Sequence, residues 1–186
     1  MQILTLSGST RLASSNSHLL RVLGEVAPGE TDFVECQLIS KLPIFNPDSE
    51  NEKTPIVVEE FCKCIDEASG IVISSPEYVH AIPGGLKNAI DWLVSRHEII
   101  RKPIVLAHAS HRGDECLAQL RRVLSTVSEG FSEEIFVRIP LVSKSTHEIE
   151  EILSFSENVD LMQRFISSFL EHIKSTERQQ NNVFSS

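Results

Sequence analysis

Short apolar runs alternate with amphipathic runs along the whole 186-residue chain, and this alternation limits the possible folds more than any other feature. We expect strands at 2–6, 31–36, 71–73, 104–107 and 135–139, and helices at 17–26, 56–68, 85–95, 113–128 and about 159–174. Uninterrupted apolar strands are typical of a parallel sheet that is buried on both faces, with helices as the crossovers. The pattern therefore predicts a three-layer α/β/α fold around a doubly wound, five-stranded parallel sheet of order 2-1-3-4-5.

One domain is the simplest organisation for a chain of this length, and we expect it to span residues 1–174. The segment 40–55 is rich in proline and polar residues and is expected to be a loop. We place no regular element in the polar stretch 143–158. Residues 175–186 contain few apolar side chains, so we expect a disordered polar tail.

The charge and composition exclude several classes of function. A formal net charge of −9, from 17 basic and 26 acidic residues, argues against nucleic-acid binding. No stretch approaches the ~20 apolar residues of a membrane span, and no secretory signal precedes the first strand, so we expect a cytoplasmic protein without membrane contact. The cysteines and histidines show no disulfide or metal-ligand spacing, so we expect no metal site.

The turn after the first strand is rich in hydrogen-bonding side chains. It reads Gly8-Ser9-Thr10-Arg11-Leu12-Ala13-Ser14-Ser15-Asn16 and leads into a helix. Free backbone N–H groups and the helix dipole favour an anion at such a helix N-terminus, and the planar guanidinium of Arg11 matches phosphate oxygens. The turn predicts a phosphate cradle, although it lacks both the dinucleotide glycine fingerprint and the P-loop pattern. The alternative is an ordinary capped helix start with an incidental arginine.

The position of this turn in the predicted sheet favours the cradle. In the order 2-1-3-4-5, a ligand crevice forms at the carboxyl ends of strands 1 and 3, where the winding direction reverses. The turn follows strand 1, and the long loop 74–84 follows strand 3. Pro76 and Pro83 restrict that loop, so it can aim main-chain groups at a planar heterocycle while Tyr78 covers an aromatic face. The alternative is a proline-bounded loop with a purely structural role.

The two segments together resemble the markers of the NADPH-dependent FMN reductase family of flavodoxin-like proteins. The first marker is a Gly-Ser-x-Arg-x-x-Ser-x-Asn turn, matched by Gly8, Ser9, Arg11, Ser14 and Asn16. The second is a Pro-Glu-Tyr-Asn-x-x-x-Pro-Gly-x-Leu-Lys-Asn-Ala-Ile-Asp-Trp segment, matched by Pro76, Glu77, Tyr78, Pro83, Gly84, Leu86, Lys87, Asn88, Ala89, Ile90, Asp91 and Trp92. Two long motifs at the right separation are far more specific than either motif alone.

The resemblance implies FMN as cofactor and NADPH or NADH as electron donor. It implies that Ser9, Arg11, Ser14 and Asn16 hold the FMN phosphate, with Ser15 nearby in the same turn. It further implies that Pro76, Glu77, Tyr78 and Val79 wrap the ribityl chain and the edge of the ring. The loop after strand 4, with Ser110, His111 and Gly113, would close over the ring. The flavin carries the hydride chemistry, so we expect no catalytic side chain and name no nucleophile or general base.

Two departures from the family pattern concern these loops. Val79 stands where an asparagine is commoner. The loop after strand 4 has only Gly113 where several glycines are usual, and charged side chains crowd it. Among these, Arg112 can hold a dinucleotide phosphate, or it can form a surface ion pair with Asp114 or Glu115.

The resulting functional prediction is an NAD(P)H oxidoreductase that passes hydride from nicotinamide to FMN and electrons on to a quinone, a free flavin or an azo-type acceptor. Its partners would be a small-molecule acceptor and, as is common in the family, further copies of itself in a homodimer or homotetramer. Two alternatives are a flavin-binding or redox-sensing protein with little turnover, and a one-electron flavodoxin. A hydrolase is the weakest alternative, because neither Ser9 nor Ser110 stands in a Gly-x-Ser-x-Gly elbow.

Overall fold

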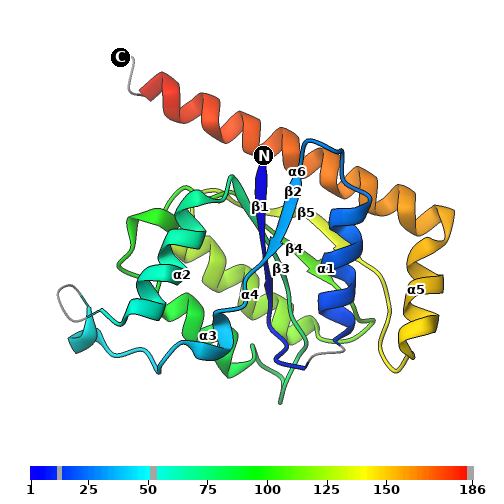
Figure 1. Cartoon of the computed structure of the whole chain (residues 1–186), viewed down its shortest axis with the longest axis horizontal. Coiled ribbons are helices and arrows are strands. Elements are labelled where there is room, and N and C mark those ends of the chain that lie inside the picture. The colour runs from blue at the N-terminus through cyan, green and yellow to red at the C-terminus, as the bar shows by residue number, and fades with distance from the viewer. Residues whose placement is uncertain (12–13, 51–53, 184–186) are drawn as a thin grey trace.

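The structure is a computed structural model that describes residues 1–11, 14–50 and 54–183, the last four of these by backbone only. Its described residues contain one five-stranded sheet (Figure 1). The strands are β1 (Gln2–Ser7), β2 (Asp32–Glu35), β3 (Gly70–Ser74), β4 (Ile104–His108) and β5 (Phe131–Arg138). All neighbouring strands are parallel, and their order is β2-β1-β3-β4-β5. The predicted fold class and strand order are confirmed.

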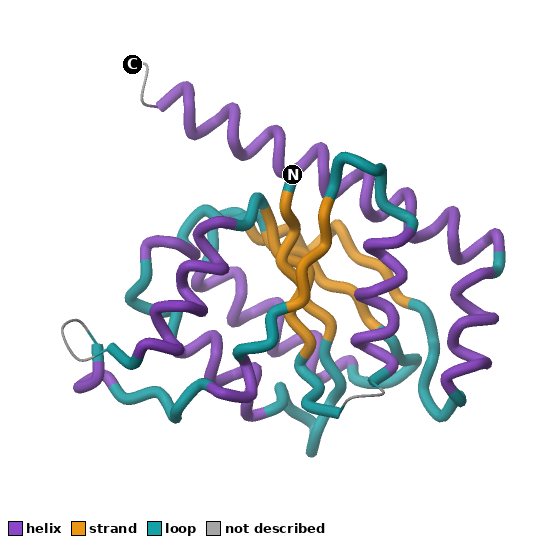
Figure 2. Tube along the Cα trace, viewed as in Figure 1, coloured by secondary structure: helices purple, strands orange, loops and turns teal. Residues whose placement is uncertain are grey.

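Helices cover both faces of the sheet (Figure 2). They are α1 (Ser15–Glu25), α2 (Ile56–Glu67), α3 (Gly84–Asp91), α4 (Asp114–Val127), α5 (Thr146–Ser154) and α6 (Ser156–Val183), with short 3₁₀ helices η1 (Ile39–Lys41), η2 (Pro47–Ser49) and η4 (His97–Ile99). One core lies under α2, α3 and α4 and includes Phe61 and Leu120. The second core lies under α1, α5 and α6 and includes Leu23 and Phe169.

The central strands show why an uninterrupted apolar run is needed. Every residue of β3 and β4 is buried. Ile71 and Ile73 face the core under α2 and α4, whereas Val72 between them faces the core under α1 and α6. Successive side chains of a strand point to opposite faces, so a strand with helices on both sides is apolar at every position.

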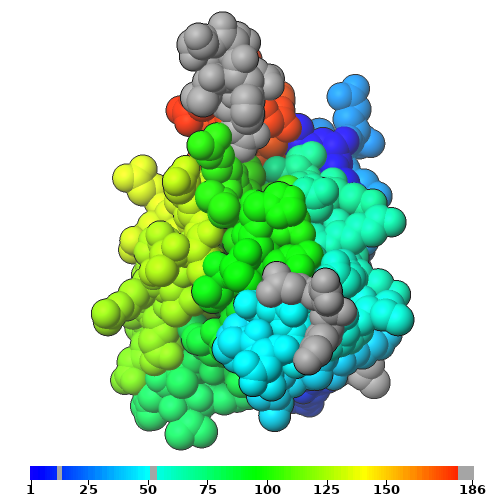
Figure 3. Space-filling model, turned by 90° about the vertical axis from the view of Figure 1, so that its left-hand side faces the viewer, coloured from blue at the N-terminus to red at the C-terminus, as the bar shows by residue number. Residues whose placement is uncertain are grey.

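Two elements differ in extent from the sequence prediction. α3 ends at Asp91, and Trp92 follows in a turn where its indole Nε1 donates to the carbonyl oxygen of Pro43 at 2.8 Å. η4 follows, and Figure 3 shows this part of the chain between α2 and α4. β5 begins at Phe131, four residues before the predicted start. The exposed Glu133 and Glu134 lie where its register with β4 shifts, and such an irregularity is tolerated in an edge strand.

The region from residue 143 onward needs a larger correction. α5 lies within the polar stretch to which no element was assigned. Its N-terminus is a capping box in which Ser145 and Glu148 satisfy each other's backbone N–H groups, and its Ile149 and Leu153 are buried. The segment is rich in Ser and Glu and has few apolar residues, so its apolar pattern does not predict this short amphipathic helix.

The disordered tail predicted from residue 175 is also wrong for most of its length. α6 continues to Val183 and extends beyond the sheet (Figure 1). Up to residue 179, the last whose side chain is described, Ile173 is the last buried residue of this helix, and Glu177, Arg178 and Gln179 are exposed. Those three residue types favour a helix intrinsically, so the helix elongates without a buried face. Residues 184–186 of the predicted tail lie outside the described residues.

Phe169 is the residue whose truncation tests how α6 holds the sheet. Its side chain is fully buried, and it packs so closely on the start of β3 that a Cβ placed on Gly70 would lie 2.6 Å from its Cζ. Phe169→Ala is expected to lower the free energy of unfolding by about 3–5 kcal/mol. Phe155→Ala, at a half-exposed position, is the control and should cost about 1 kcal/mol or less in the same urea titration. Equal losses would contradict the assigned packing.

Candidate functional site

A cavity of about 390 Å³ opens at the carboxyl ends of the central strands. The loops after β1, β3, β4 and β5 form its walls, at the edge of the sheet that is lowest in Figure 2. Its lining residues are Ser9, Arg11, Ser14, Ser15, Asn16, Pro76, Glu77, Tyr78, Ala109, Ser110, Arg112, Gly113, Val142 and Ser143. The cavity therefore lies at the switch point that the strand order predicts.

Most of the predicted site residues line this cavity. The exceptions are Val79 and His111, which are exposed and do not contribute to its wall. Leu12 and Ala13, which belong to the predicted cradle turn, lie outside the described residues. Four lining residues were not among the predicted binding residues: Ala109, Arg112, Val142 and Ser143.

Hydroxyl groups hold the turn after β1 in shape. Ser9 Oγ accepts from the backbone N–H of Arg11 at 3.2 Å. Ser14 is the N-cap of α1, and its Oγ accepts from the backbone N–H of Asn16 at 3.2 Å. Asn16 is buried, and its Oδ1 accepts from Ser74 Oγ at 2.9 Å. Asn16 thus links the start of α1 to the end of β3. This structural role comes in addition to the phosphate contact that the sequence predicts for it.

Gly8 lets the turn after β1 and the loop after β3 approach each other closely. Its backbone N–H donates to the carbonyl oxygen of Ser74 at 2.8 Å. A Cβ at this position would lie 2.2 Å from Ser75 Oγ, which no side chain can tolerate. The glycine of the motif is therefore required by packing between two loops.

The tip of the loop after β3 is a tight hairpin with unusual backbone angles. Tyr78 and Ala81 exchange backbone hydrogen bonds of 3.2 and 3.1 Å across Val79 and His80. Val79 and His80 have φ values of +53° and +58°, a region that a β-branched side chain rarely adopts. Asparagine tolerates this region better, which explains why it is commoner there in the family. The Val79 side chain is 95% exposed and points away from the cavity wall.

Glu77 anchors the same loop to α4. Its Oε2 accepts from the backbone N–H of Cys116 at 2.9 Å, in the first turn of α4, where a carboxylate also meets the positive end of the helix dipole. Gln119 adds a second anchor, because its Nε2 donates to the carbonyl oxygen of His80 at 2.9 Å. Both contacts span nearly forty residues of chain, so no local sequence signal predicts them.

The loop after β4 is supported from below by His108. This side chain is 1% exposed, and its Nε2 lies 2.5 Å from the carbonyl oxygen of Arg112. A carbonyl only accepts, so Nε2 carries the proton, and Nδ1 has no partner among the described residues. Gly113 adopts φ +94°, and a Cβ there would lie 3.1 Å from the imidazole ring. In the sequence, His108 is only the residue that follows a predicted buried strand, so nothing there indicates its hydrogen bond to the loop after β4.

The loop after β5 closes the remaining side of the cavity. The backbone N–H of Leu141 donates to the carbonyl oxygen of Ala109 at 3.0 Å, and Ser15 Oγ donates to the carbonyl oxygen of Leu141 at 3.4 Å. Ser143 follows with a φ of +63°. This wall follows an edge strand and carries no motif, so sequence reasoning had no signal for it.

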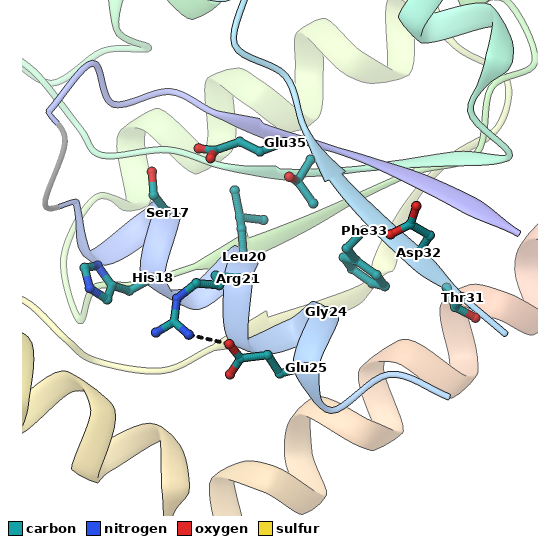
Figure 4. Close-up of a pocket in the computed structure, with 11 residues that line it drawn as sticks. Ser17, His18, Leu20, Arg21, Gly24, Glu25, Thr31, Asp32, Phe33 and Glu35 are labelled. Carbon is teal, nitrogen blue, oxygen red and sulfur yellow. Dashed lines mark hydrogen bonds and ion pairs between the residues drawn. The ribbon is translucent and has the colours of Figure 1, made fainter. Parts of the chain in front are cut away.

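A second groove, of about 460 Å³, lies between α1 and β2 (Figure 4). Its arginine, Arg21, forms an ion pair with Glu25. Asp32 and Glu35 add further negative charge to its lining. This groove is larger than the first cavity but offers a poor electrostatic environment for an anion. The cavity around Arg11 is therefore the better candidate site.

Within residues 1–11, 14–50 and 54–183, no group of three or more His, Cys, Asp or Glu side chains is placed to hold a metal ion. No helix in that part of the chain is both long enough and apolar enough to cross a membrane.

The fold and the cavity define a class of protein: a doubly wound, flavodoxin-like α/β domain with a hydroxyl-rich, arginine-bearing crevice at its switch point. Residues 1–132 match the model of the family described as NADPH-dependent FMN reductase. The chain belongs to this family, and the resemblance carried by the two sequence motifs is confirmed. The family is one of enzymes whose cofactors are FMN and NAD(P)H.

Individual relatives agree with this assignment. The chain is 35% identical over 130 residues to a quinone reductase of Escherichia coli K12, a match that covers 67% of this chain and 69% of the relative. It is 42% identical over 95 residues to an NAD(P)H:quinone oxidoreductase of Solanum tuberosum, covering 50% and 49% of the two chains. The solved structure of FerB, a flavoenzyme NAD(P)H:(acceptor) oxidoreductase from Paracoccus denitrificans, superposes with a TM-score of 0.78 at 22% identity, covering 94% and 98%. At that identity the superposition speaks for the fold alone.

The buried His108 makes the free energy of unfolding of the protein depend on pH. Burial lowers the pKa of His108 below its ordinary value of 6.5, so the unfolded chain binds a proton more readily than the folded protein. The contribution of His108 is fully present above pH 6.5 and is lost as the pH falls below it. The free energy of unfolding should therefore drop more between pH 7.5 and 5.5 in the wild type than in His108→Gln, which keeps an N–H donor but does not titrate. Parallel urea titrations that show equal drops would contradict the assignment.

Proposed function

We propose that this protein uses the cavity at the switch point to bind FMN and acts as an NAD(P)H oxidoreductase that reduces a quinone. The observation that carries this proposal is the pairing of Arg11 and the N-terminus of α1 with a restricted loop across the same cavity. Bound FMN supplies the hydride-accepting chemistry that amino-acid side chains lack. The protein has to bind, orient and shield the reacting rings.

The β1 side of the cavity fits a phosphate group. Arg11 has no carboxylate within 4 Å among the described residues, so its charge is available to a ligand. Ser9, Ser14 and Ser15 line the same wall and add hydroxyl groups. A protein with a net charge of −9 repels a phosphate overall, so binding must come from this local set of donors.

The opposite side of the cavity fits a flat aromatic ring. Pro76 and Tyr78 line it from one loop, and Ser110 and Gly113 from the other. Because Gly113 carries no Cβ, the second loop packs closely on the ring of His108 and on Glu77 of the first loop. The contacts of Glu77 and His108 hold these loops in place before a ligand arrives, which lowers the entropy cost of binding.

No side chain of the site is assigned as a general acid or base. His108 lies directly beneath the loop after β4, but it is buried, and burial lowers its pKa, so it stays neutral at physiological pH. Its proton is committed to the carbonyl oxygen of Arg112. This agrees with hydride transfer, in which the cofactors carry the reacting atoms and the protein positions them.

Quinones are the proposed acceptors because two of the relatives are named quinone reductase and NAD(P)H:quinone oxidoreductase. A free flavin and an azo compound remain acceptors to compare in the same assay. We further propose a cytoplasmic location, which suits four free cysteines. We also propose a homodimer or homotetramer, for which Ile44 and Val94, 88% and 64% exposed, supply apolar surface.

The test is to add FMN to the purified protein, record the flavin absorption bands, and then add NADPH or NADH without oxygen. Bleaching of the bands within seconds and recovery on adding a benzoquinone are expected. Bound flavin that does not bleach would favour a flavin-binding or sensing protein, to which the crowded loop with His111 and Arg112 lends some support. A failure to bind FMN at all would reject the proposed function.

Arg11→Ala is expected to weaken FMN binding by about tenfold or more, because a charge-assisted contact to the phosphate is lost. Riboflavin lacks that phosphate, so its affinity should change by less than about threefold. Fluorescence titration of both flavins measures the two effects. Arg21→Ala removes the same charge from α1, outside this cavity, and should leave both affinities unchanged. Equal losses for FMN and riboflavin would contradict the assigned phosphate contact.

A further inference from the structure

Arg112 is a second arginine in the wall of the same cavity, on the loop opposite Arg11. Its surroundings fix its position. Its backbone N–H donates to Ser110 Oγ at 2.9 Å, and its carbonyl oxygen accepts from His108. The guanidinium Nε donates to Nε2 of His111 at 3.2 Å. His111, which is not part of the wall, therefore orients Arg112, and the Nη edge of the guanidinium is left for another partner.

The acidic residues nearest in sequence do not neutralise Arg112. Asp114 pairs with Arg138 on β5 at 2.5 Å. The carboxylate Oε1 of Glu115 lies 3.3 Å from Nδ1 of His80. Among the described residues, no carboxylate lies within 4 Å of Arg112. Of the two alternatives that the sequence leaves open for this residue, the ion pair with Asp114 or Glu115 is not formed in this structure.

The balance of charge in the cavity points to a second anion. Arg11 and Arg112 both line it, and Glu77 is the acidic residue in its described wall. The carboxylate of Glu77 already accepts from the backbone N–H of Cys116. In a chain of net charge −9, two arginines without carboxylate partners in one cavity are a local exception. Arginine is the residue best suited to bind phosphate oxygens with two parallel N–H groups.

FMN carries a single phosphate, and the Arg11 turn with the N-terminus of α1 accounts for it. For hydride transfer the nicotinamide ring would have to reach the flavin ring, so the donor would bind beside the loops that line the ring side of the cavity. The loop that carries Arg112 borders that side of the cavity. The reduced nicotinamide ring is neutral, and the negative charge of the donor resides on its phosphates.

We propose that Arg112 binds a phosphate group of the nicotinamide dinucleotide donor. The inference rests on the proposed function. The phosphate is either the 2′-phosphate, which only NADPH carries, or one of the two phosphates of the pyrophosphate bridge, which NADH shares. Both kinds of phosphate would bind the arginine in the same way. They differ in which donors lose affinity when the arginine is removed.

The experiment compares Arg112→Ala with the wild type in steady-state assays with saturating FMN and a benzoquinone. The donors are NADPH, NADH and reduced nicotinamide mononucleotide, which keeps only the phosphate next to the nicotinamide ribose. KM for the affected donors is expected to rise about tenfold with kcat within about twofold, because a uniform binding contact is lost. Arg122→Ala on α4 removes an exposed arginine outside the cavity and serves as the charge-matched control.

The pattern across donors identifies the phosphate. A rise for NADPH alone indicates the 2′-phosphate, and a rise for both dinucleotides but not the mononucleotide indicates the adenosine-side phosphate. A rise for all three indicates the phosphate next to the nicotinamide ribose. The salt dependence of KM should also weaken in Arg112→Ala relative to Arg122→Ala.

Three results would overturn the inference. These are unchanged KM values for all donors, a weakened affinity for FMN in place of the donor, or a rise in KM for an anionic acceptor alone. Calorimetry of NADP⁺ and NAD⁺ binding to the FMN-loaded protein separates this inference from the proposed function. An inactive protein whose dinucleotide binding still falls in Arg112→Ala would reject the function and support the inference.

Discussion

The close approach of the turn after β1 to the end of β3 is the constraint on which the rest of the site depends. Gly8 donates to the carbonyl oxygen of Ser74, and Asn16 at the start of α1 accepts from the hydroxyl group of Ser74. The missing Cβ of Gly8 makes this contact possible. Because the winding of the sheet reverses between these two strands, their loops diverge above the contact and leave a crevice. The N-terminus of α1 and the loop after β3 then face the same space.

The walls of that crevice are held by long-range contacts that exist without a ligand. Glu77 caps α4 through Cys116, and His108 supports the backbone at Arg112 from below. Each contact joins a loop to a helix or strand that packs on the core, and this restricts the motion of the loop. A site that is shaped in advance binds a flavin without paying to order its loops, and it keeps two rings in a reactive arrangement.

The sheet, its strand order and most of the cavity wall could be predicted from the sequence, because they follow from local patterns. A β-branched run such as residues 71–73 is typical of a strand that is buried on both faces of a sheet. A hydroxyl-rich turn before a helix is typical of an anion site. The two helices that were not fully predicted, α5 and the end of α6, lack the strong apolar pattern on which the prediction relies. α5 is not predicted because Ile149 and Leu153 are its only two buried apolar residues and they lie in a polar stretch. The helix beyond residue 174 is not predicted because Glu177, Arg178 and Gln179 are polar, although these residue types favour a helix intrinsically.

The fold class and the family follow from the sequence alone, since both depend on residue types at short spacings. Which charges remain available to a ligand depends on the tertiary structure. Arg112 has Asp114 and Glu115 close by in the chain, yet Asp114 pairs with Arg138 on β5, and the carboxylate of Glu115 lies beside the His80 ring. Ion pairing depends on distances between side chains in space, and those distances are set by how strands and loops far apart in sequence pack together.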